Sequence, residues 1–318
     1  MAEIGYSLSS EEHGPRELVE YARRAEEVGF SFALISDHFH PWIHQQGQSP
    51  FAWSVMGGIA QVTSRLRLGT GVTCPTFRYH PAIIAQAAAT MATMMPGRFF
   101  LGLGSGEALN EHIIGEHWPP SVIRQDMLAE AVEMIRALWN GEEQSHWGEF
   151  FTIEQAQLFT LPDQLPPIYI AASGKSSAEM AGEYGDGLIS TAPKKELVAN
   201  FEEGGGAGKV KMGQLTVCWA ESERSARETM KTWWPNTALA GALTSELPTP
   251  DHFEQAIASV NEEAIYEHIP LGPDPQVHLQ AIQKYLDAGF DQVYIHQIGP
   301  DQEGFFKFYQ KEILLKYQ

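Results

Sequence analysis

The chain has 318 residues, of which 43% are hydrophobic, so it can bury a large core as one big α/β barrel or as two ordinary domains. Its 40 acidic and 21 basic residues give a formal charge of −19, and no run of Lys or Arg opposes this field, which argues against nucleic acid as a partner. Two cysteines, Cys74 and Cys218, and an N-terminus without a basic lead or an apolar core predict a cytoplasmic protein, and no apolar run approaches the roughly 20 residues that span a bilayer.

Eight short apolar segments alternate along the chain with amphipathic helical stretches. In chain order they are IGYSL from residue 4, FALIS from 32, LRLGTGV from 66, FFLGLG from 99, PIYIAA from 167, GLIST from 187, GQLTVCWA from 213 and QVYIHQ from 292. Helical spacing between the first two places Leu18, Ala22, Ala25 and Val28 on one face. Eight strands, each followed by a helix, predict a (β/α)8 barrel that forms a single domain over residues 1–318; a doubly wound sheet is the lesser alternative.

Two segments interrupt this alternation. Residues 142–166 alternate aromatic and polar side chains before the fifth strand, which is typical of a small hairpin or cover. Residues 233–273 are polar and have the pattern of a helical insertion. Because insertions of this kind carry function on a rigid scaffold, we expect substrate selection in these two segments.

The loops after the strands give the candidate site residues, because a (β/α)8 barrel builds its active site at the C-terminal ends of its strands. In strand order these residues are Glu11; Asp37 and His38; Gly71, Val72 and Cys74; Glu107; Ser173 and Gly174; Thr191 and Lys194; and His296. They are far apart in sequence and are expected to converge in space. For His296, a hydrogen-bonded core position competes with a substrate contact.

The segment SDHFHPWIHQQ, residues 36–46, raises the question of a metal site. The pair His38 and His40 forms the H-x-H that binds metal in amidohydrolase barrels. Such a site needs three or more protein ligands, yet the fifth and sixth strands end in IAASGK and LISTAP, which contain no His, Cys, Asp or Glu. We therefore predict no metal and keep a metallohydrolase only as an alternative.

Three motifs follow the second, third and fourth strands. They are SDHFHPW, GTGVTCPTFRYHPAIIAQ and GLGSGEALNEH, and the glycines of the last permit close approach to a flat group. In this order the motifs resemble the luciferase-like barrel oxidoreductases and, more narrowly, the deazaflavin-dependent group typified by F420-dependent glucose-6-phosphate dehydrogenase. The resemblance covers nearly the whole chain, through YIAASGKSSAEMAGEYGDGLIST to VYIHQIGPDQEGFFKFY, and weakens between about residues 204 and 273.

The resemblance implies an oxidoreductase that binds coenzyme F420 and acts on a CH–OH group. His38 is then the base that takes the hydroxyl proton while hydride leaves the substrate carbon. Trp42 forms a wall of the substrate site, and Glu107 supplies the proton at the pyrimidine edge of the deazaflavin. A histidine that titrates near neutrality suits the first role.

The resemblance also implies a cofactor site and a substrate site. Asp37 binds the ring region of the cofactor, and Gly71 and Val72 form a backbone bulge with a cis peptide that supports the ring. The remaining cofactor residues are Cys74, Asn110, Ala172, Ser173 and Gly174. On the substrate side the resemblance implies Glu11, Trp42 and Lys194, and position at the strand ends adds Thr191 and His296.

The sequence departs from the sugar-phosphate enzymes of this group in its cations. Those enzymes hold the phosphate with two lysines and an arginine, and only Lys194 matches this set. No Lys or Arg occurs between Lys231 and Lys284, where the other two are expected. Two lost contacts, at roughly 1.5–3 kcal/mol for each charged hydrogen bond, predict little activity on glucose 6-phosphate.

Three further expectations concern alternatives and assembly. An FMN-dependent monooxygenase of the same fold is the nearest alternative, and a non-catalytic cofactor binder is another. The resemblance implies a homodimer formed through helices near strands two to four, where AIIAQAAATMATMM is apolar and small enough for close packing. The expected partner otherwise is a small-molecule substrate.

Overall fold

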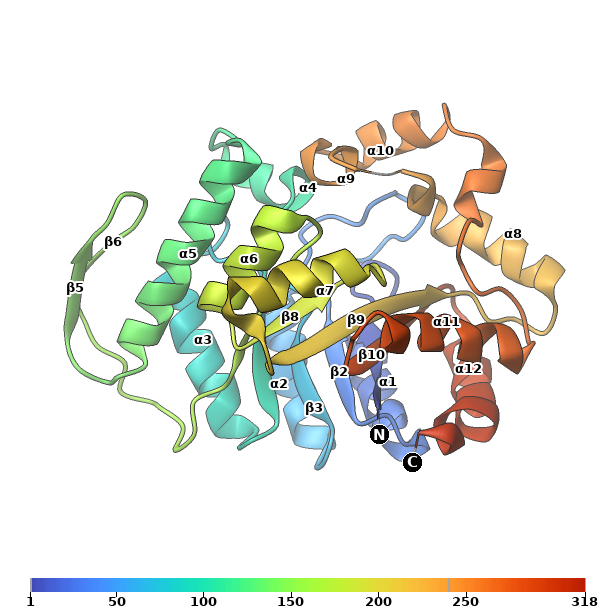
Figure 1. The fold of residues 1–318 in the computed structure, drawn as a ribbon, viewed down its shortest axis with the longest axis horizontal. Coiled ribbons are helices and arrows are strands. Elements are labelled where there is room, and N and C mark those ends of the chain that lie inside the picture. The colour runs from blue at the N-terminus through green and yellow to red at the C-terminus, as the bar shows by residue number, and fades with distance from the viewer. Residues whose placement is uncertain (1, 240, 318) are drawn as a thin grey trace.

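Eight parallel strands close into a barrel in the computed structural model, which describes residues 2–239 and 241–317 (Figure 1). The strands are β1 (Glu3–Leu8), β2 (Phe32–Ile35), β3 (Arg67–Thr70), β4 (Phe99–Leu103), β7 (Ile168–Ala171), β8 (Gly187–Ser190), β9 (Val210–Val217) and β10 (Gln292–Gln297). They neighbour one another in chain order, and β10 pairs with β1 to close the barrel. The predicted (β/α)8 barrel is confirmed, and every predicted strand segment overlaps one of these eight.

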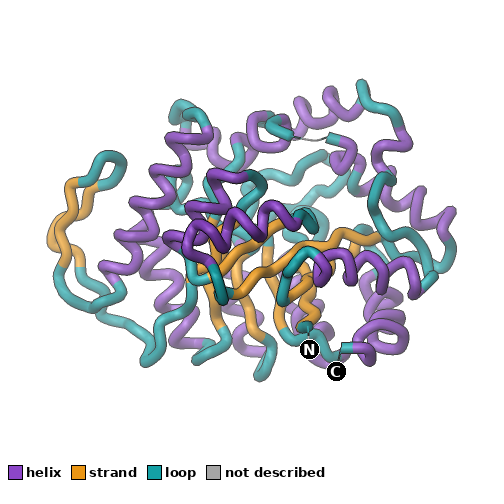
Figure 2. Tube along the Cα trace, in the orientation of Figure 1, coloured by secondary structure: helices purple, strands orange, loops and turns teal. Residues whose placement is uncertain are grey.

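Helices surround this barrel and link its strands (Figure 2). They are α1 (Pro15–Val28), α2 (Ala52–Val62), α3 (Pro81–Met94), α4 (Ala108–Glu111), α5 (Ser121–Leu138), α6 (Lys175–Tyr184), α7 (Lys195–Phe201), α8 (Glu223–Trp233), α11 (Pro275–Asp287) and α12 (Gln302–Phe308). The first is typical: Leu18, Ala22, Ala25 and Val28 are buried on one face, as their spacing predicts. Gly29 then ends the helix at φ 109°, a left-handed conformation that glycine adopts without strain.

Large side chains fill the barrel interior. One cluster of buried residues lies inside it, namely Phe32, Leu34, Phe100, Tyr169, Ile189, Met212 and Tyr294. Gly69 on β3 faces the ring of Phe100, which would collide with any Cβ at that position. The interior is therefore a packed core, and the space for a reaction lies at the ends of the strands.

The two interrupting segments lie at different places on the barrel (Figure 1). Residues 142–166 contain the antiparallel pair β5 (Gln144–Trp147) and β6 (Thr152–Ala156), which lies beside α5 and is anchored there by His146 Nε2, 3.0 Å from Glu130 Oε1. Residues 233–273 form α9 (Leu243–Glu246) and α10 (Pro250–Ile257), with short turns of helix at Pro235–Ala238 and Glu262–Ile265. This second segment lies near α4, which follows β4, and so adjoins the C-terminal ends of the strands.

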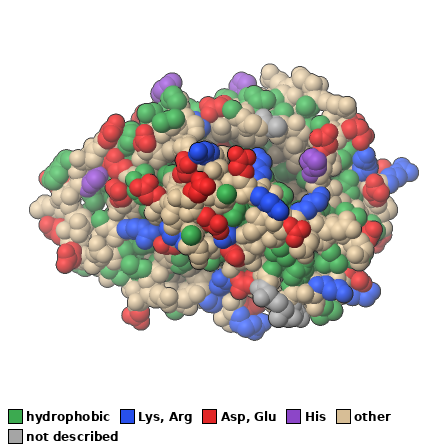
Figure 3. All heavy atoms as spheres, in the orientation of Figure 1, with side chains coloured by type: hydrophobic (Ala, Val, Ile, Leu, Met, Phe, Trp, Pro, Cys, Tyr) green, Lys and Arg blue, Asp and Glu red, His purple; other side chains and the backbone are tan. Residues whose placement is uncertain are grey.

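Charged side chains of both signs lie on the surface (Figure 3). On the face shown in Figure 3, acidic and basic side chains are interspersed, and the described residues form no continuous basic stripe across it. Within residues 2–239 and 241–317, no helix combines the length and the apolar character that crossing a membrane requires.

Candidate active site

His38 lies between two carboxylates at the mouth of the barrel. It follows β2, and its Nε2 is 3.4 Å from Glu11 Oε1 and 3.6 Å from Glu107 Oε2. Its Nδ1 is 3.1 Å from the carbonyl oxygen of His40. Because a carbonyl only accepts, that contact assigns the Nδ1 proton and leaves Nε2 as the basic nitrogen of the neutral ring. The nitrogen that faces both carboxylates is thus the one that can take up a proton.

Glu11 is buried and is oriented by hydroxyl groups. Its Oε2 accepts hydrogen bonds from Ser36 Oγ at 2.6 Å and Ser9 Oγ at 3.2 Å, which leaves Oε1 to face His38. Burial acts to raise the pKa of Glu11, but the charge of His38 and the Ser36 hydrogen bond outweigh it, and the pKa is lowered. Glu11 therefore stays ionised beside His38, where it can stabilise an imidazolium.

The pKa of Glu107 is shifted in the opposite direction, above its ordinary value. Burial raises its pKa and the charge of Glu11 adds to this, whereas His38 and the hydrogen bond from Asn110 act to lower it. Asn110 Nδ2 donates to Glu107 Oε2 at 3.2 Å, and Asn110 Oδ1 accepts from the backbone N–H of Phe39 at 2.9 Å. Glu107 holds its proton to higher pH than a free carboxyl does, which suits a proton donor.

Trp42 lies between His38 and the 233–273 insertion. The centroid of its ring is 5.0 Å from that of His38 and 5.1 Å from that of Phe253 on α10, with the second pair close to perpendicular. Phe253 is fully buried. The insertion therefore supports one wall of the site directly, through an edge-to-face aromatic contact.

The side chain of Asp37 is fully buried. Its oxygens accept hydrogen bonds from Thr73 Oγ1 at 2.6 Å and Tyr79 OH at 3.1 Å, and they pair with Arg78 Nη2 at 3.2 Å. All three partners come from the loop after β3. Asp37 thus joins the loops after β2 and β3, and its contact with a cofactor ring stays a prediction.

The same arginine holds a second buried carboxylate. The backbone N–H of Arg78 donates to Glu111 Oε2 at 2.9 Å, and Arg78 Nε is 3.6 Å from Glu111 Oε1. Burial raises the pKa of Glu111 to about 7, although the charge of Arg78 opposes the shift.

At the end of β4, two glycines pack against side chains of the loop after β3. The peptide between Gly71 and Val72 is cis, as the resemblance implies. A Cβ at Gly104 would lie 2.7 Å from Cγ2 of Val72, and one at Gly106, where φ is +83°, would lie 2.6 Å from Sγ of Cys74. A Cβ at either position would force these side chains to move, and the positive φ at Gly106 also favours glycine.

The end of β7 leads directly into the start of α6. Ala172 is buried there, and Ser177 Oγ accepts from the backbone N–H groups of Ser173 and Gly174 at 3.3 and 3.2 Å. A Cβ at Gly174 would meet no atom within 4 Å, so the space over this helix start is open. Lys175 is exposed beside it. A helix N-terminus with an adjacent lysine favours an anionic group.

Two of the remaining predicted substrate residues follow β8, and the third lies on β10. Thr191 and Lys194 are exposed after β8, and Lys194 forms no ion pair with any residue in 2–239 or 241–317. His296 is buried, with its Nε2 3.2 Å from Glu12 Oε2 and its ring centroid 4.5 Å from that of Trp234. The burial and the Glu12 partner of His296 agree with a hydrogen-bonded core position, and its contact with a substrate stays a prediction.

Sequence reasoning missed the partners of these residues. Glu12 follows Glu11 directly and binds both His296 and the backbone N–H of Gly299, the latter at 2.8 Å. Trp234 lies in the 233–273 insertion, where no motif marks functional residues. The adjacent acids in SSEEH were the available signal, because two neighbouring buried carboxylates each require a partner.

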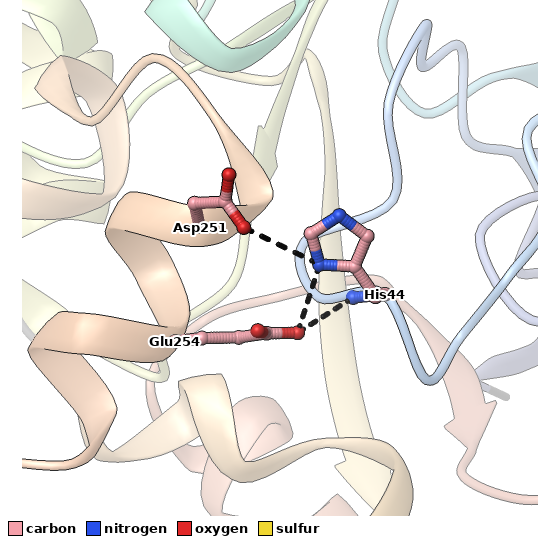
Figure 4. A group of neighbouring side chains, drawn as sticks. All are labelled: His44, Asp251 and Glu254. Atoms are coloured by element: carbon pink, nitrogen blue, oxygen red, sulfur yellow. Dashed lines mark hydrogen bonds and ion pairs between the residues drawn. The ribbon is translucent and has the colours of Figure 1, made fainter.

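His44, the third histidine of SDHFHPWIHQQ, lies at the outer edge of the site. His44 Nδ1 is 3.1 Å from Glu254 Oε1 and 3.9 Å from Asp251 Oδ1, both on α10 (Figure 4). All three side chains are exposed. The group joins the loop after β2 to the insertion and is separate from the pair of carboxylates around His38.

Comparison with known proteins places the chain in a family. Residues 1–292 match the luciferase-like monooxygenase family. The chain is 35% identical to an F420-dependent glucose-6-phosphate dehydrogenase of Microbacterium testaceum and 38% identical to one of Nocardia farcinica, in each case over 98% of this chain and 96% of the relative. The chain belongs to the luciferase-like monooxygenase family.

A solved structure extends this similarity to three dimensions. An F420-dependent secondary alcohol dehydrogenase in complex with an F420–acetone adduct superposes with a TM-score of 0.92, at 31% sequence identity and over 98% of each chain. The resemblance predicted from three short motifs is confirmed over the full length.

Proposed function

We propose that this chain is an F420-dependent dehydrogenase that transfers hydride between the carbinol carbon of an alcohol or sugar and the deazaflavin. The observation that carries the proposal is the placement of His38 Nε2 between Glu11 and Glu107, beside Trp42, at the mouth of the barrel. Relatives that cover nearly the whole chain are F420-dependent dehydrogenases of glucose 6-phosphate and of secondary alcohols.

The residues present fit this cofactor. Gly104 and Gly106 let Val72 and Cys74, two of the predicted cofactor residues, pack closely against the end of β4, beside the cis peptide between Gly71 and Val72. The open N-terminus of α6 and the exposed Lys175 suit an anionic tail. The residues that would hold the group are Asp37, Gly71, Val72, Cys74, Asn110, Ala172, Ser173 and Gly174. When bound, F420 supplies a hydride acceptor, a function that no protein side chain provides.

The proton steps belong to the chain itself. His38 takes the hydroxyl proton of the substrate on Nε2, because Nδ1 is committed to the carbonyl of His40. Glu11, ionised and 3.4 Å away, stabilises the imidazolium that forms. Glu107 keeps a proton available because its pKa is raised. Trp42 covers the side of the histidine and excludes water there.

We infer that the substrate lacks a phosphate. Lys194 is the one cation that matches the phosphate-binding set, and the approximate counterparts of the other two, Gln255 and Glu267, are exposed and not cationic. A phosphate dianion would thus lose two of three charged contacts, at roughly 1.5–3 kcal/mol each. Thr191 and Lys194, with Glu11, Trp42 and His296, are the proposed substrate-side residues for an uncharged alcohol or sugar.

We also propose a cytoplasmic homodimer. Large apolar side chains are exposed along two neighbouring helices, namely Phe51 and Val62 at the ends of α2 and Ile83 and Met94 on α3. This face lies beside the strands that the resemblance associates with dimer contact. Sedimentation of the chain at several concentrations tests the dimer, and a monomer at all of them would contradict it.

The activity is tested by following the loss of F420 absorbance with a short secondary alcohol, an uncharged sugar or glucose 6-phosphate. The proposal expects saturable reduction with at least one uncharged substrate and little with glucose 6-phosphate. Efficient oxidation of glucose 6-phosphate would overturn the substrate assignment, and no reduction with any alcohol or sugar would overturn the dehydrogenase.

A further inference from the structure

Gln46 has a buried side chain whose amide is fully used. Its Oε1 accepts from the backbone N–H of Trp42 at 2.8 Å and from that of Ile43 at 3.3 Å. Its Nε2 donates to the carbonyl oxygen of Trp233 at 3.0 Å and to Asn236 Oδ1 at 3.5 Å. The side chain is 2% exposed, although it lies in a loop. A buried amide with partners at both ends fixes two segments against each other.

One of these segments carries Trp42 to the reactive site. The N–H that Gln46 holds belongs to Trp42 itself, whose ring lies 5.0 Å from His38. On its other side the ring rests on Phe253 of the insertion. The ring of Trp42 can rotate about its side-chain bonds, so it keeps one position only if its backbone and its neighbours are fixed.

The other segment, residues 233–236, contacts His296. Trp233 and Asn236 flank Trp234, whose ring packs on His296. His296 is bound by Glu12, the residue directly after Glu11. Contacts therefore run from His38 through Trp42 and Gln46 to the 233–236 turn, and from Trp234 of that turn to His296 and Glu12. Glu12 adjoins Glu11 in the sequence, and Glu11 faces His38.

We propose that Gln46 is a positioning residue that holds Trp42, and with it the 233–236 turn, in the arrangement that binds substrate. Gln46 is buried and acts through the backbone of Trp42. This inference rests on the proposed dehydrogenase function for its kinetic consequence. Its structural consequence, the ordering of the N–H groups of Trp42 and Ile43, holds for the free protein without any activity.

The test compares two neighbouring glutamines. Gln46→Met keeps the length of the side chain and removes both hydrogen-bonding ends, whereas Gln45→Met makes the same change at an exposed position one residue away. Hydrogen exchange of the 41–47 segment is measured in the free protein, and the Kd for F420, kcat and substrate KM are measured afterwards. Gln46→Asn keeps both hydrogen-bonding groups on a side chain that is one methylene shorter, so it serves as the conservative variant.

The expected results separate positioning from general damage. In Gln46→Met, exchange at Trp42 and Ile43 becomes faster and kcat/KM falls about ten- to a hundredfold, while the Kd for F420 stays within about twofold. Gln46→Asn lies between this variant and the wild type, and it carries the test alone if Gln46→Met does not fold. Gln45→Met behaves as wild type.

Two results would overturn the proposal. One is unchanged exchange at Trp42 and Ile43 in Gln46→Met, and the other is a change in Gln45→Met of the same size. A protein that binds no F420 and oxidises no alcohol, yet shows the faster exchange, would instead reject the proposed function and leave the positioning role in place.

Discussion

The loops after β1 to β4 and the 233–273 insertion meet at the same site, but they are built differently. The loops are held by buried charged and polar groups, such as Asp37 with Arg78 and Glu11 with Ser36. The insertion is held mainly by apolar packing, in which Ile43, Leu109, Leu239 and Phe253 form one cluster. Directional contacts fix reacting groups to within fractions of an ångström, whereas apolar packing mainly sets shape.

The difference assigns separate tasks to the two regions. In the proposed mechanism the loops supply the proton-transfer groups His38 and Glu107, and the insertion supplies the surface behind Trp42. We therefore expect changes in the loops to alter the rate of the reaction and changes in the insertion to alter the choice and affinity of substrate. The predictions below test that division in order of expected effect.

The largest effect is expected at His38. His38→Ala removes the base and should lower turnover by about 10²- to 10⁴-fold, the usual range for a lost general base. The Kd for F420 should stay close to that of the wild type, because His38 is not among the cofactor residues, and fluorescence titration checks this. Near-normal turnover in His38→Ala would remove the residue from the mechanism.

A smaller effect with a distinct pH signature is expected at Glu107. Turnover in alcohol oxidation needs its protonated form, so activity should fall as pH rises through its raised pKa. Glu107→Gln keeps the side-chain shape and should lower turnover about a hundredfold. It should also abolish the decline at high pH. The prediction fails if the variant keeps the same decline in a profile of kcat against pH.

The insertion should affect substrate instead. Phe253→Leu removes the ring that supports Trp42 and should raise substrate KM about tenfold, with the Kd for F420 unchanged. Ala256→Leu changes a partly buried position on the same helix and is the matched control for repacking. A weakened F420 affinity in Phe253→Leu would break the division between the two regions.

The smallest effect concerns stability within the loop region. The pKa of Glu111 is raised to about 7 from its ordinary value of 4.5, so the folded protein keeps a proton that the unfolded chain loses. Its contribution to stability therefore falls as pH rises from 4.5 to about 7, by about 3 kcal/mol at most. In Glu111→Gln this part of the pH dependence should disappear from urea unfolding measured between pH 5 and pH 8. An unchanged pH dependence would contradict the assignment.

Short motifs were enough to predict one region and not the other. Apolar runs placed all eight strands, and the motifs after β2, β3 and β4 located His38 and Glu107, whose convergence follows from the barrel. The insertion has no comparable pattern, because its contacts depend on which apolar surfaces meet in space. Gln46 and Trp233 are 187 residues apart in the sequence, and no local spacing predicts that pair.

Tertiary packing also determines which partners Asp37 and His296 contact. Asp37 stands beside His38 in the sequence, yet its carboxylate lies fully buried under three partners from the next loop. His296 follows the alternation of a barrel strand, but only the position of Glu12 reveals its partner. Such pairings are set by tertiary packing and become visible only once the strands are arranged.

The central claim is that this barrel is built for a deazaflavin. Its most direct test is fluorescence titration of the purified protein with oxidised F420 and, separately, with FMN. We predict saturable binding of F420 and much weaker binding of FMN, with F420 binding retained in His38→Ala. Preferential binding of FMN would contradict the claim and make oxygen consumption the next assay, and binding of neither would reject the cofactor site altogether.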